Sequence, residues 1–487
     1  MLNLPTKYYF LNILGHFYPF FFNTTYRMAA FAAVSFAEGI TFGAWLRALA
    51  APVANDGDET ITAAGNSWGW GARTARINVS AVAPDGNAGF NMGVYNDVTM
   101  SLSAGDEANL WVKPLDIVKV SYGKYDNNTL RGDVCYGSWN WLRPTSSWLA
   151  EDEGLLMSGN GGTGLMAEIT PMENLYIQAM VPITTAQVKA GTTYKNLRGG
   201  FAYTVPGLVK IKGQYIGKGA GSTDDTDTVA AVDGTVLGAD GTTLTAHDST
   251  YELADGESWL RAPVAASDGK GTDGNSNCTL EAEVDVLAVE GLNVGLGFQY
   301  NVVKDADVKS GKAVKEALNA TDVDDACAKL KDCAEKQMKI ALGASYQVMP
   351  ELKVSASGAF FTYYKADVDG VDVKFDPRFQ AGLGVDYDLG DGLAVNADFR
   401  YLSKQKVDAD GFDIENNIEN KTSDHMAFSV GVTKSVSSNG YIGVAFQGQT
   451  NSGDFANTVI TAKKTDDDGA YKKNFTWAIP VALSVWF

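Results

Sequence analysis

Long hydrophobic runs are missing from this chain of 487 residues. No run of about 18 consecutive apolar residues occurs, and this argues against a transmembrane helix. If the chain sits in a membrane, it must do so as a closed β-barrel, because only there do strands satisfy all their backbone hydrogen bonds.

Histidine and positive charge are also scarce. The 58 acidic residues outnumber the 39 basic residues and leave a formal net charge of -19, which argues against nucleic acid as a partner. A barrel phospholipase or protease needs a histidine as its base. His16 lies in an expected export signal, His247 in a polar loop and His425 at a strand end, so we predict that the chain is not an enzyme.

Only four cysteines are present. Cys327 and Cys333 lie close together in one loop and could form a disulfide in an oxidising exterior. Cys135 and Cys278 could also pair, and the sequence does not choose among the three connectivities. The acidic segments 367–370 and 408–411 end in glycine but lack the EF-hand spacing, so they indicate turns. We predict no metal ion and no cofactor.

A strict alternation of apolar and small or polar residues is abundant instead. In residues 475–487 every odd position is large and apolar, ending in Leu483, Val485 and Phe487. This period of two is typical of a β-strand with one apolar face. A core strand of a soluble sandwich alternates in the same way, so the segment alone does not decide between the two.

The same pattern recurs along the chain as paired runs joined by turn residues. Residues 76–81 and 90–94 flank a Pro-Asp-Gly-Asn turn, a strong hairpin signal. Further alternating segments raise the total to about 18 strands, with 16 as the alternative count. Segments 110–112 and 118–122 form a weaker pair, and the others are 40–46, 165–169, 175–181, 197–203, 209–215, 278–286, 292–300, 338–346, 352–360, 379–387, 393–401, 426–432 and 442–446.

Short turns and long polar loops alternate along this series. All turns therefore lie at one end of the strands and all loops at the other, which is the asymmetry of outer-membrane barrels and not of Greek-key sandwiches. We predict an all-β fold, a closed antiparallel transmembrane β-barrel with short periplasmic turns and long external loops. Its apolar face points into lipid, and its polar face lines a lumen too wide for side chains to fill.

The chain is predicted to have one domain after a targeting segment. Residues 1–37 contain interrupted apolar blocks and end in Ser-Phe-Ala, typical of a secretory signal cleaved after Ala37, although the true start of translation is open. Residues 38–487 form the barrel, with extended loops at 126–163, 218–277 and 303–336.

In its strand pattern, its connections and its C-terminal aromatic residue, the chain resembles the bacterial outer-membrane porins. The resemblance implies an integral protein of the outer membrane, surrounded by lipid, that passes small hydrophilic solutes by diffusion. It also implies that Leu483, Val485 and Phe487 belong to a signal read by the barrel assembly machinery, and that the protein forms homotrimers. Two alternatives remain: a surface adhesin or host-interaction protein anchored by a barrel, and a substrate-specific outer-membrane transporter.

In general porins the third external loop folds into the lumen and narrows it. Loop 126–163 takes that position here, although it lacks the Pro-Glu-Phe-Gly-Gly signature of that loop. Its acidic candidates for the constriction are Asp133, Glu151, Asp152 and Glu153. The basic residues expected to face them from the inner wall are Arg47, Arg76, Lys119, Arg378 and Arg400. Opposed charges of this kind would set up a transverse field at the constriction.

Overall fold

A computed structural model describes most of the chain. The described residues are 39–55, 60–67, 73–97, 102–125, 130–132, 156–159, 161–185, 188, 191–221, 234–237, 244–247, 258–261, 274–304, 306, 314, 335–368, 371–403, 407–409, 424–450 and 475–487. The predicted signal 1–37 lies outside them, as do Cys327, Cys333 and the four acidic candidates of loop 126–163. Much of the predicted loops 218–277 and 303–336 also lies outside.

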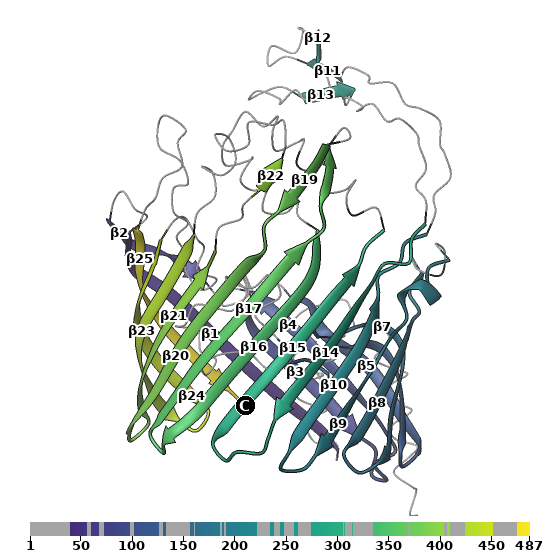
Figure 1. The fold of residues 1–487 in the computed structure, drawn as a ribbon, viewed down its shortest axis with the longest axis horizontal. Helices are drawn as coiled ribbons and strands as arrows, with labels where there is room; N and C mark the ends of the chain where they lie inside the picture. The colour runs from purple at the N-terminus through teal and green to yellow at the C-terminus, as the bar shows by residue number, and fades with distance from the viewer. Residues whose placement is uncertain are drawn as a thin grey trace, which may run out of the picture.

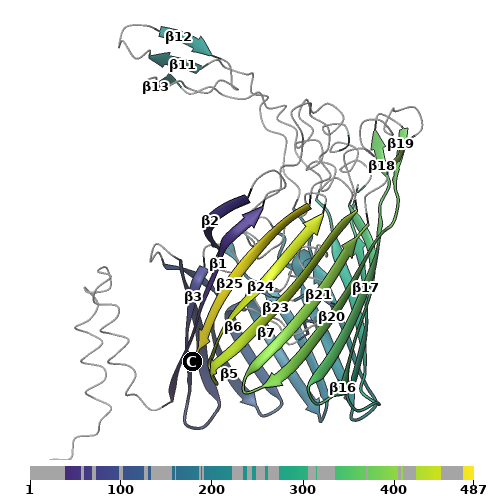
Figure 2. The ribbon, with the colours of Figure 1, turned by 90° about the vertical axis from the view of Figure 1, so that its left-hand side faces the viewer.

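The described residues form a closed antiparallel β-barrel (Figures 1 and 2). One sheet holds 19 strands; β2 pairs only with β1, so 18 strands make the ring. In order around the ring these are β1 (Ile40–Asn55), β3 (Arg73–Val82), β4 (Ala88–Asp97), β5 (Leu102–Leu115), β6 (Val118–Tyr125), β7 (Gly162–Met172), β8 (Leu175–Pro182), β9 (Arg198–Val205), β10 (Val209–Gly217), β14 (Cys278–Val286), β15 (Leu292–Val302), β16 (Lys336–Met349), β17 (Leu352–Tyr363), β20 (Arg378–Gly390), β21 (Leu393–Leu402), β23 (His425–Ser437), β24 (Gly440–Thr450) and β25 (Phe475–Trp486).

The first and last strands close the ring. β25 pairs with β24 on one side and with β1 on the other, where Trp45 lies opposite Trp486 and Asn55 opposite Trp477. The terminal residue extends this seam, because Ala44 N donates to Phe487 O (3.0 Å) and Phe487 N donates to Ala44 O (2.8 Å). Closure leaves no exposed sheet edge along the ring, as strands in hydrocarbon require.

The two ends of the barrel differ as the sequence predicts. Consecutive strands are joined at one end by tight turns such as the one at Asp391 and Gly392, and at the other end by the long connections. Both turn residues have positive φ, 51° and 73°. Glycine suits such a position because it has no Cβ to clash. The predicted arrangement of short turns and long loops is confirmed, and so is the count of about 18 strands.

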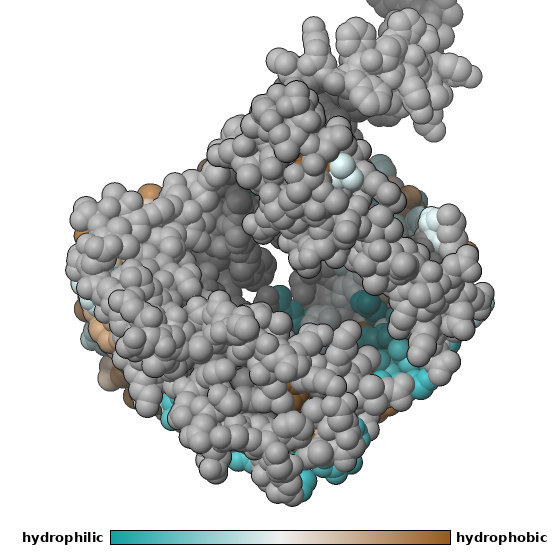
Figure 3. Space-filling model, turned by 90° about the horizontal axis from the view of Figure 1, so that it is seen from above, coloured by the Kyte–Doolittle hydropathy of each residue, from teal (hydrophilic) through white to brown (hydrophobic). Residues whose placement is uncertain are grey.

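Side chains alternate between an apolar outside and a polar inside. On β14, Leu280, Ala282 and Val284 are exposed on the outer surface, while Glu281 and Glu283 are buried on the inner one. Large apolar residues cover the outside of the other strands too, among them Phe298, Leu342, Phe360, Leu383, Val430 and Phe446. Seen from above, an opening remains at the centre of the barrel, and hydrophilic residues line part of its wall (Figure 3).

Such an outer surface is stable in hydrocarbon and not in water. Rings flank one another on the outside near the loop end, for example Phe428 against Phe475 (centroids 6.0 Å apart) and Phe446 against Trp477 (5.8 Å). Aromatic side chains favour the membrane–water interface, where an apolar ring borders polar headgroups. The chain is therefore an integral membrane barrel of the outer-membrane type. Among the described residues, no helix is long and apolar enough to cross a membrane.

Some elements differ from the sequence prediction. The first strand was expected to end at Leu46, but β1 continues to Asn55, because its upper half pairs with the additional strand β2 (Thr60–Ser67). Two small sheets at the loop end were not predicted (Figures 1 and 2). They contain β11 (Gly234–Leu237), β12 (Leu244–His247) and β13 (Ser258–Arg261), and β18 (Ala366–Val368), β19 (Val371–Phe375) and β22 (Val407–Ala409).

Candidate functional site: the lumen and its inserted loop

The connection between β6 and β7 enters the barrel. These are the fifth and sixth strands of the ring, so this is the third loop at its end of the barrel, as the sequence predicts. Two parts of it are described, residues 130–132 and 156–159. They lie against the inner wall and bond to each other, because Gly132 N donates to Met157 O (2.8 Å).

Glu281 on β14 holds the second part of the loop. Its Oε1 accepts from the hydroxyl of Ser158 (2.6 Å), and its Oε2 accepts from the Ser158 backbone N–H (3.2 Å). Gln299 donates to the same carboxylate at 2.5 Å, and Gln214 donates both to it and to Ser158 O (2.7 Å). Glu281 is 4% exposed, so its charge depends on these donors for solvation.

Lys212 on β10 holds the first part of the loop. Its Nζ donates to Arg131 O at 3.2 Å and to Glu283 Oε1 at 2.8 Å, and it lies 3.8 Å from Asp285 Oδ2. The Lys212 and Glu283 side chains are almost fully buried, with 2% and 0% exposed. Buried charges of this kind are tolerated only when they are paired and hydrogen-bonded, so the loop backbone completes the environment of the pair.

Glycines on the inner face make room for the loop. A Cβ on Gly297 would lie 2.1 Å from Leu156 O, and one on Gly295 would lie 2.4 Å from Leu156 Cδ1. On β9, a Cβ on Gly200 would lie 2.5 Å from Leu130 Cδ1. Because contacts this short do not occur, the wall needs glycine where the loop rests on it.

Apolar side chains of the loop anchor it at two further places. Leu130 and Met157, both fully buried, pack with Ala202 and Tyr176. Leu156 packs with residues from β16 and β17, which are separated from β7 by five and six strands of the ring. These partners are Ala341, Ala359, Phe361 and Tyr363. The described part of the loop at Leu156 therefore rests on wall strands far from β6 and β7, where the loop begins and ends.

The sequence did not predict which wall residues hold the inserted loop. Glu281, Glu283 and Asp285 occupy the polar positions of segment 278–286, which the alternation places on the inner face, but alternation alone does not say which inner residues meet the loop. The available signal was the concentration of carboxylates on the inner face of one strand, followed by Gly295 and Gly297 on the inner face of the next. A wall that accommodates a loop needs both hydrogen-bond acceptors and space.

The five predicted wall cations lie on the ring strands and contact other wall residues. Arg76 forms long ion pairs with Asp106 and Glu107 of β5, at 3.9 and 3.8 Å. Lys119 binds Glu168 of β7 at 2.7 Å. These partners come from strands one or two places away in the ring, so the inner wall already balances much of its own positive charge.

The remaining three cations each contact a nearby wall residue. Arg400 is 1% exposed and binds Asp398, two residues away on the same strand, at 2.8 Å. Arg378 donates from Nε to Ser403 O at 3.1 Å. The guanidinium of Arg47 lies 3.8 Å from the centre of the Trp45 ring. The facing loop carboxylates lie outside the described residues, so their pairing with these cations stays a prediction.

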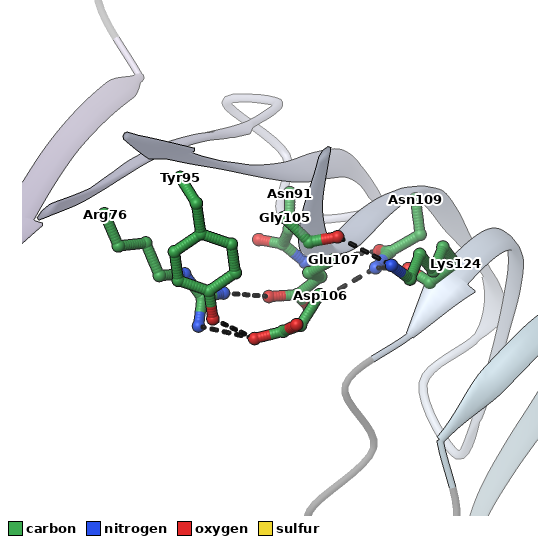
Figure 4. Close-up of polar contacts among 8 residues, drawn as sticks. All are labelled: Arg76, Asn91, Tyr95, Gly105, Asp106, Glu107, Asn109 and Lys124. Carbon is green, nitrogen blue, oxygen red and sulfur yellow. Dashed lines mark hydrogen bonds and ion pairs between the residues drawn. The ribbon is translucent and has the colours of Figure 1, made fainter. Parts of the chain in front are cut away.

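A bulge in β5 adds a charged group to the inner wall (Figure 4). Met92 of β4 lies opposite Ala108 and Val94 opposite Ala104, so three residues of β5 face the single residue Gly93. Asp106 and Glu107 project from this bulge on the same side of the sheet as Arg76 and Tyr95 (Figure 4). The Tyr95 hydroxyl donates to Asp106, and Asn109 donates to Glu107 Oε1 at 3.3 Å.

The structure also describes the C-terminal residues and one of the four cysteines. Leu483, Val485 and Phe487 lie on the outer surface of the closing strand, and Phe487 is 77% exposed. Cys278 is a free thiol, so the alternative disulfide between Cys135 and Cys278 is not formed. No cluster of metal-ligating side chains occurs among the described residues.

Comparison with known proteins finds likeness in structure and not in sequence. No family model matches the chain, and no curated protein matches it. The solved structures that it resembles include an anion-selective porin from Comamonas acidovorans (12% identity, 92% of this chain and 99% of that chain covered, TM-score 0.42). They also include the outer membrane channel DcaP of Acinetobacter baumannii (10% identity, 92% and 97% covered, TM-score 0.44) and Salmonella typhi OmpF in complex with daunomycin (10% identity, 92% and 97% covered, TM-score 0.43). At such identities, none of them shows the function of this chain.

Proposed function

We propose that this protein is an outer-membrane porin, a passive diffusion channel for small hydrophilic solutes or ions. The observation that carries the proposal is the inward placement of residues 130–132 and 156–159 on a polar inner wall, in a barrel that shows an opening when it is seen from above (Figure 3). A ring of 18 strands is too wide for side chains to fill, so water occupies the rest of the lumen. The inserted loop narrows this aqueous path.

The loop is proposed as the constriction that selects solutes. Its acidic residues Asp133, Glu151, Asp152 and Glu153 belong to the same loop as the seated segments. Opposite them, wall cations such as Arg47, Arg76 and Arg378 would complete a transverse field that favours dipolar solutes. The net charge of -19 favours cations mildly over anions, although salt screens the charges that lie in the loops.

By resemblance to porins, we propose that the protein forms homotrimers in the membrane and is inserted by the barrel assembly machinery. We propose no catalytic activity, no cofactor and no metal. The three histidines, His16, His247 and His425, have side chains outside the described part of the structure.

Liposome swelling tests the channel and its constriction together. Vesicles that contain the protein should swell in solutions of small sugars, and the rate should fall steeply with sugar size. Gly297→Ala should speed the entry of the larger sugars, because the new Cβ displaces Leu156 from its seat. Gly358→Ala is the matched control, since a Cβ there meets only Gln380 O at 3.6 Å. Vesicles that do not swell in any sugar would contradict the channel.

A second candidate is a surface-binding protein that uses the barrel as an anchor. The observation in its favour is the small sheet of β11, β12 and β13 at the loop end (Figure 2). If that sheet carries the function, removing residues 222–273 should abolish adhesion to host cells and leave swelling unchanged. If the deletion alters swelling alone, the adhesin candidate fails.

A further inference from the structure

The bulge in β5 places an arginine and two carboxylates together on the inner wall. Gly93 and Gly105 make this arrangement possible. A Cβ on Gly105 would lie 2.1 Å from Gly93 O, so the bulged chain passes directly over the β4 backbone. A Cβ on Gly93 would lie 3.0 Å from Arg76 Nε and 3.1 Å from Nη2, so the guanidinium lies across the same glycine.

Arg76 has donors that its neighbours do not satisfy. Among the residues that the structure describes, its buried Nε has no hydrogen-bond partner. Its two terminal nitrogens lie 3.9 Å from Asp106 and 3.8 Å from Glu107, which is longer than a direct hydrogen bond. A guanidinium this poorly satisfied retains the capacity to bind a planar oxyanion with two parallel N–H donors.

The two carboxylates are held in place but still accessible. The side chains of Asp106 and Glu107 are 31% and 34% exposed, whereas that of Arg76 is 16% exposed. Tyr95 donates to Asp106 and Asn109 donates to Glu107, which fixes both carboxylates beside the guanidinium. Lys124 braces the bulge from the next strand by donating to Gly105 O at 2.8 Å.

We propose that this cluster is a binding subsite for small zwitterions, solutes that carry a carboxylate and an ammonium group close together, such as α-amino acids. The solute carboxylate binds Arg76, and its ammonium group binds Asp106 and Glu107. A simple anion meets two repelling carboxylates, and a simple cation meets the guanidinium, so only a solute with both charges is complementary. The inference rests on the proposed channel function, whose solute class it names.

Binding of three matched solutes to the purified protein tests the subsite. Isothermal titration in detergent micelles should show that L-alanine binds more tightly than propionate or ethylammonium, which carry only one of the two charges. Arg76→Gln should weaken alanine binding about tenfold or more, because a charge-assisted contact is lost. The double variant D106N/E107Q should weaken it similarly. Lys434→Gln, at an exposed position of β23 whose side chain donates to Asp391 O of a turn, should leave it unchanged.

Gly93→Ala provides a second variant that keeps every charge. The new methyl group displaces the Arg76 guanidinium, so alanine binding should weaken while the barrel still folds, as its resistance to heat in gel mobility would show. Equal binding of all three solutes, or alanine binding that survives both Arg76→Gln and Gly93→Ala, would overturn the subsite. A protein that conducts ions without preferring alanine refutes only the subsite, and one that binds alanine without conducting refutes only the channel.

Discussion

Among the residues that the structure describes, Glu281 holds the inserted loop through two hydrogen bonds to Ser158. It accepts hydrogen bonds from Ser158, Gln214 and Gln299 and is almost fully buried. Its neighbours Gln214 and Gln299 point donors at it, so an acceptor with two free oxygens is needed there. A neutral amide at this position would turn a donor toward donors.

Glu281→Gln should therefore loosen the loop without unfolding the barrel. We expect a loss of about 2 kcal/mol in the free energy of unfolding, typical of hydrogen bonds to a buried charge. Noise in the open-channel current should increase as the loop leaves its seat. Glu351→Gln, at an exposed turn, is the control and should change neither quantity. A quiet channel of unchanged stability would mean that Glu281 does not hold the loop.

At this scale the sequence predicted the face of a residue but not its partner. Arg400 was expected on the pore wall, and the sequence did not indicate that Asp398 binds it from two positions away on the same strand. Alternation has a period of two, so it assigns a side and contains no information on distance across the lumen. For the same reason, alternation does not predict the pairing of Lys212 with Glu283, although both occupy polar positions of their alternating segments.

At the scale of elements, the closing strand β25 combines two roles that can be separated. The backbone at the end of this strand closes the barrel through hydrogen bonds between Phe487 and Ala44. The phenyl side chain of Phe487 is exposed on the outside. The backbone bonds do not depend on the side chain. The phenyl side chain of Phe487 is thus free to serve as a signal for assembly.

Phe487→Ala should lower the amount of protein assembled in the outer membrane of growing cells. The same variant, refolded in detergent, should have nearly the stability of the unchanged protein, because the seam with β1 is kept. Cell fractionation and chemical unfolding measure the two quantities. A loss of stability that equals the loss of assembly would show that the residue is structural and not a signal.

Elements with regular alternation were predicted well, and irregular ones were not. The hairpin of β3 and β4 follows from its turn sequence and its apolar positions. The bulge in β5 was not predicted, because Gly105, Asp106 and Glu107 include no large apolar residue and so show no alternation. β2 was not predicted, because the acidic residues 56–62 indicate a loop. Both segments are extended because they pair with a neighbouring strand, and the local residue pattern contains no information on that pairing.

At the scale of the whole molecule, the outer surface decides where the protein is stable. Val430 and Val436 lie on β23, and both are exposed on the outside, 52% and 65% respectively. Val430 lies near the middle of the strand, whereas Val436 precedes the periplasmic turn. Depth in the bilayer is therefore the main difference between them.

Val430→Arg should cost about 2–4 kcal/mol of folding free energy in a bilayer, and Val436→Arg about 0–1 kcal/mol, because a charge costs most at the midplane. Reversible unfolding in lipid vesicles measures both values. Equal costs at the two positions would contradict the assignment of this face to lipid.

Single-channel recording in planar bilayers tests most directly whether ions pass through the lumen of the protein. The protein extracted from outer membranes should give discrete, long-lived current steps whose size rises in proportion to the bulk conductivity of the salt solution. The reversal potential in a salt gradient should show a mild preference for cations. Insertion into the bilayer without current steps would mean that the lumen is closed, and this would contradict the channel.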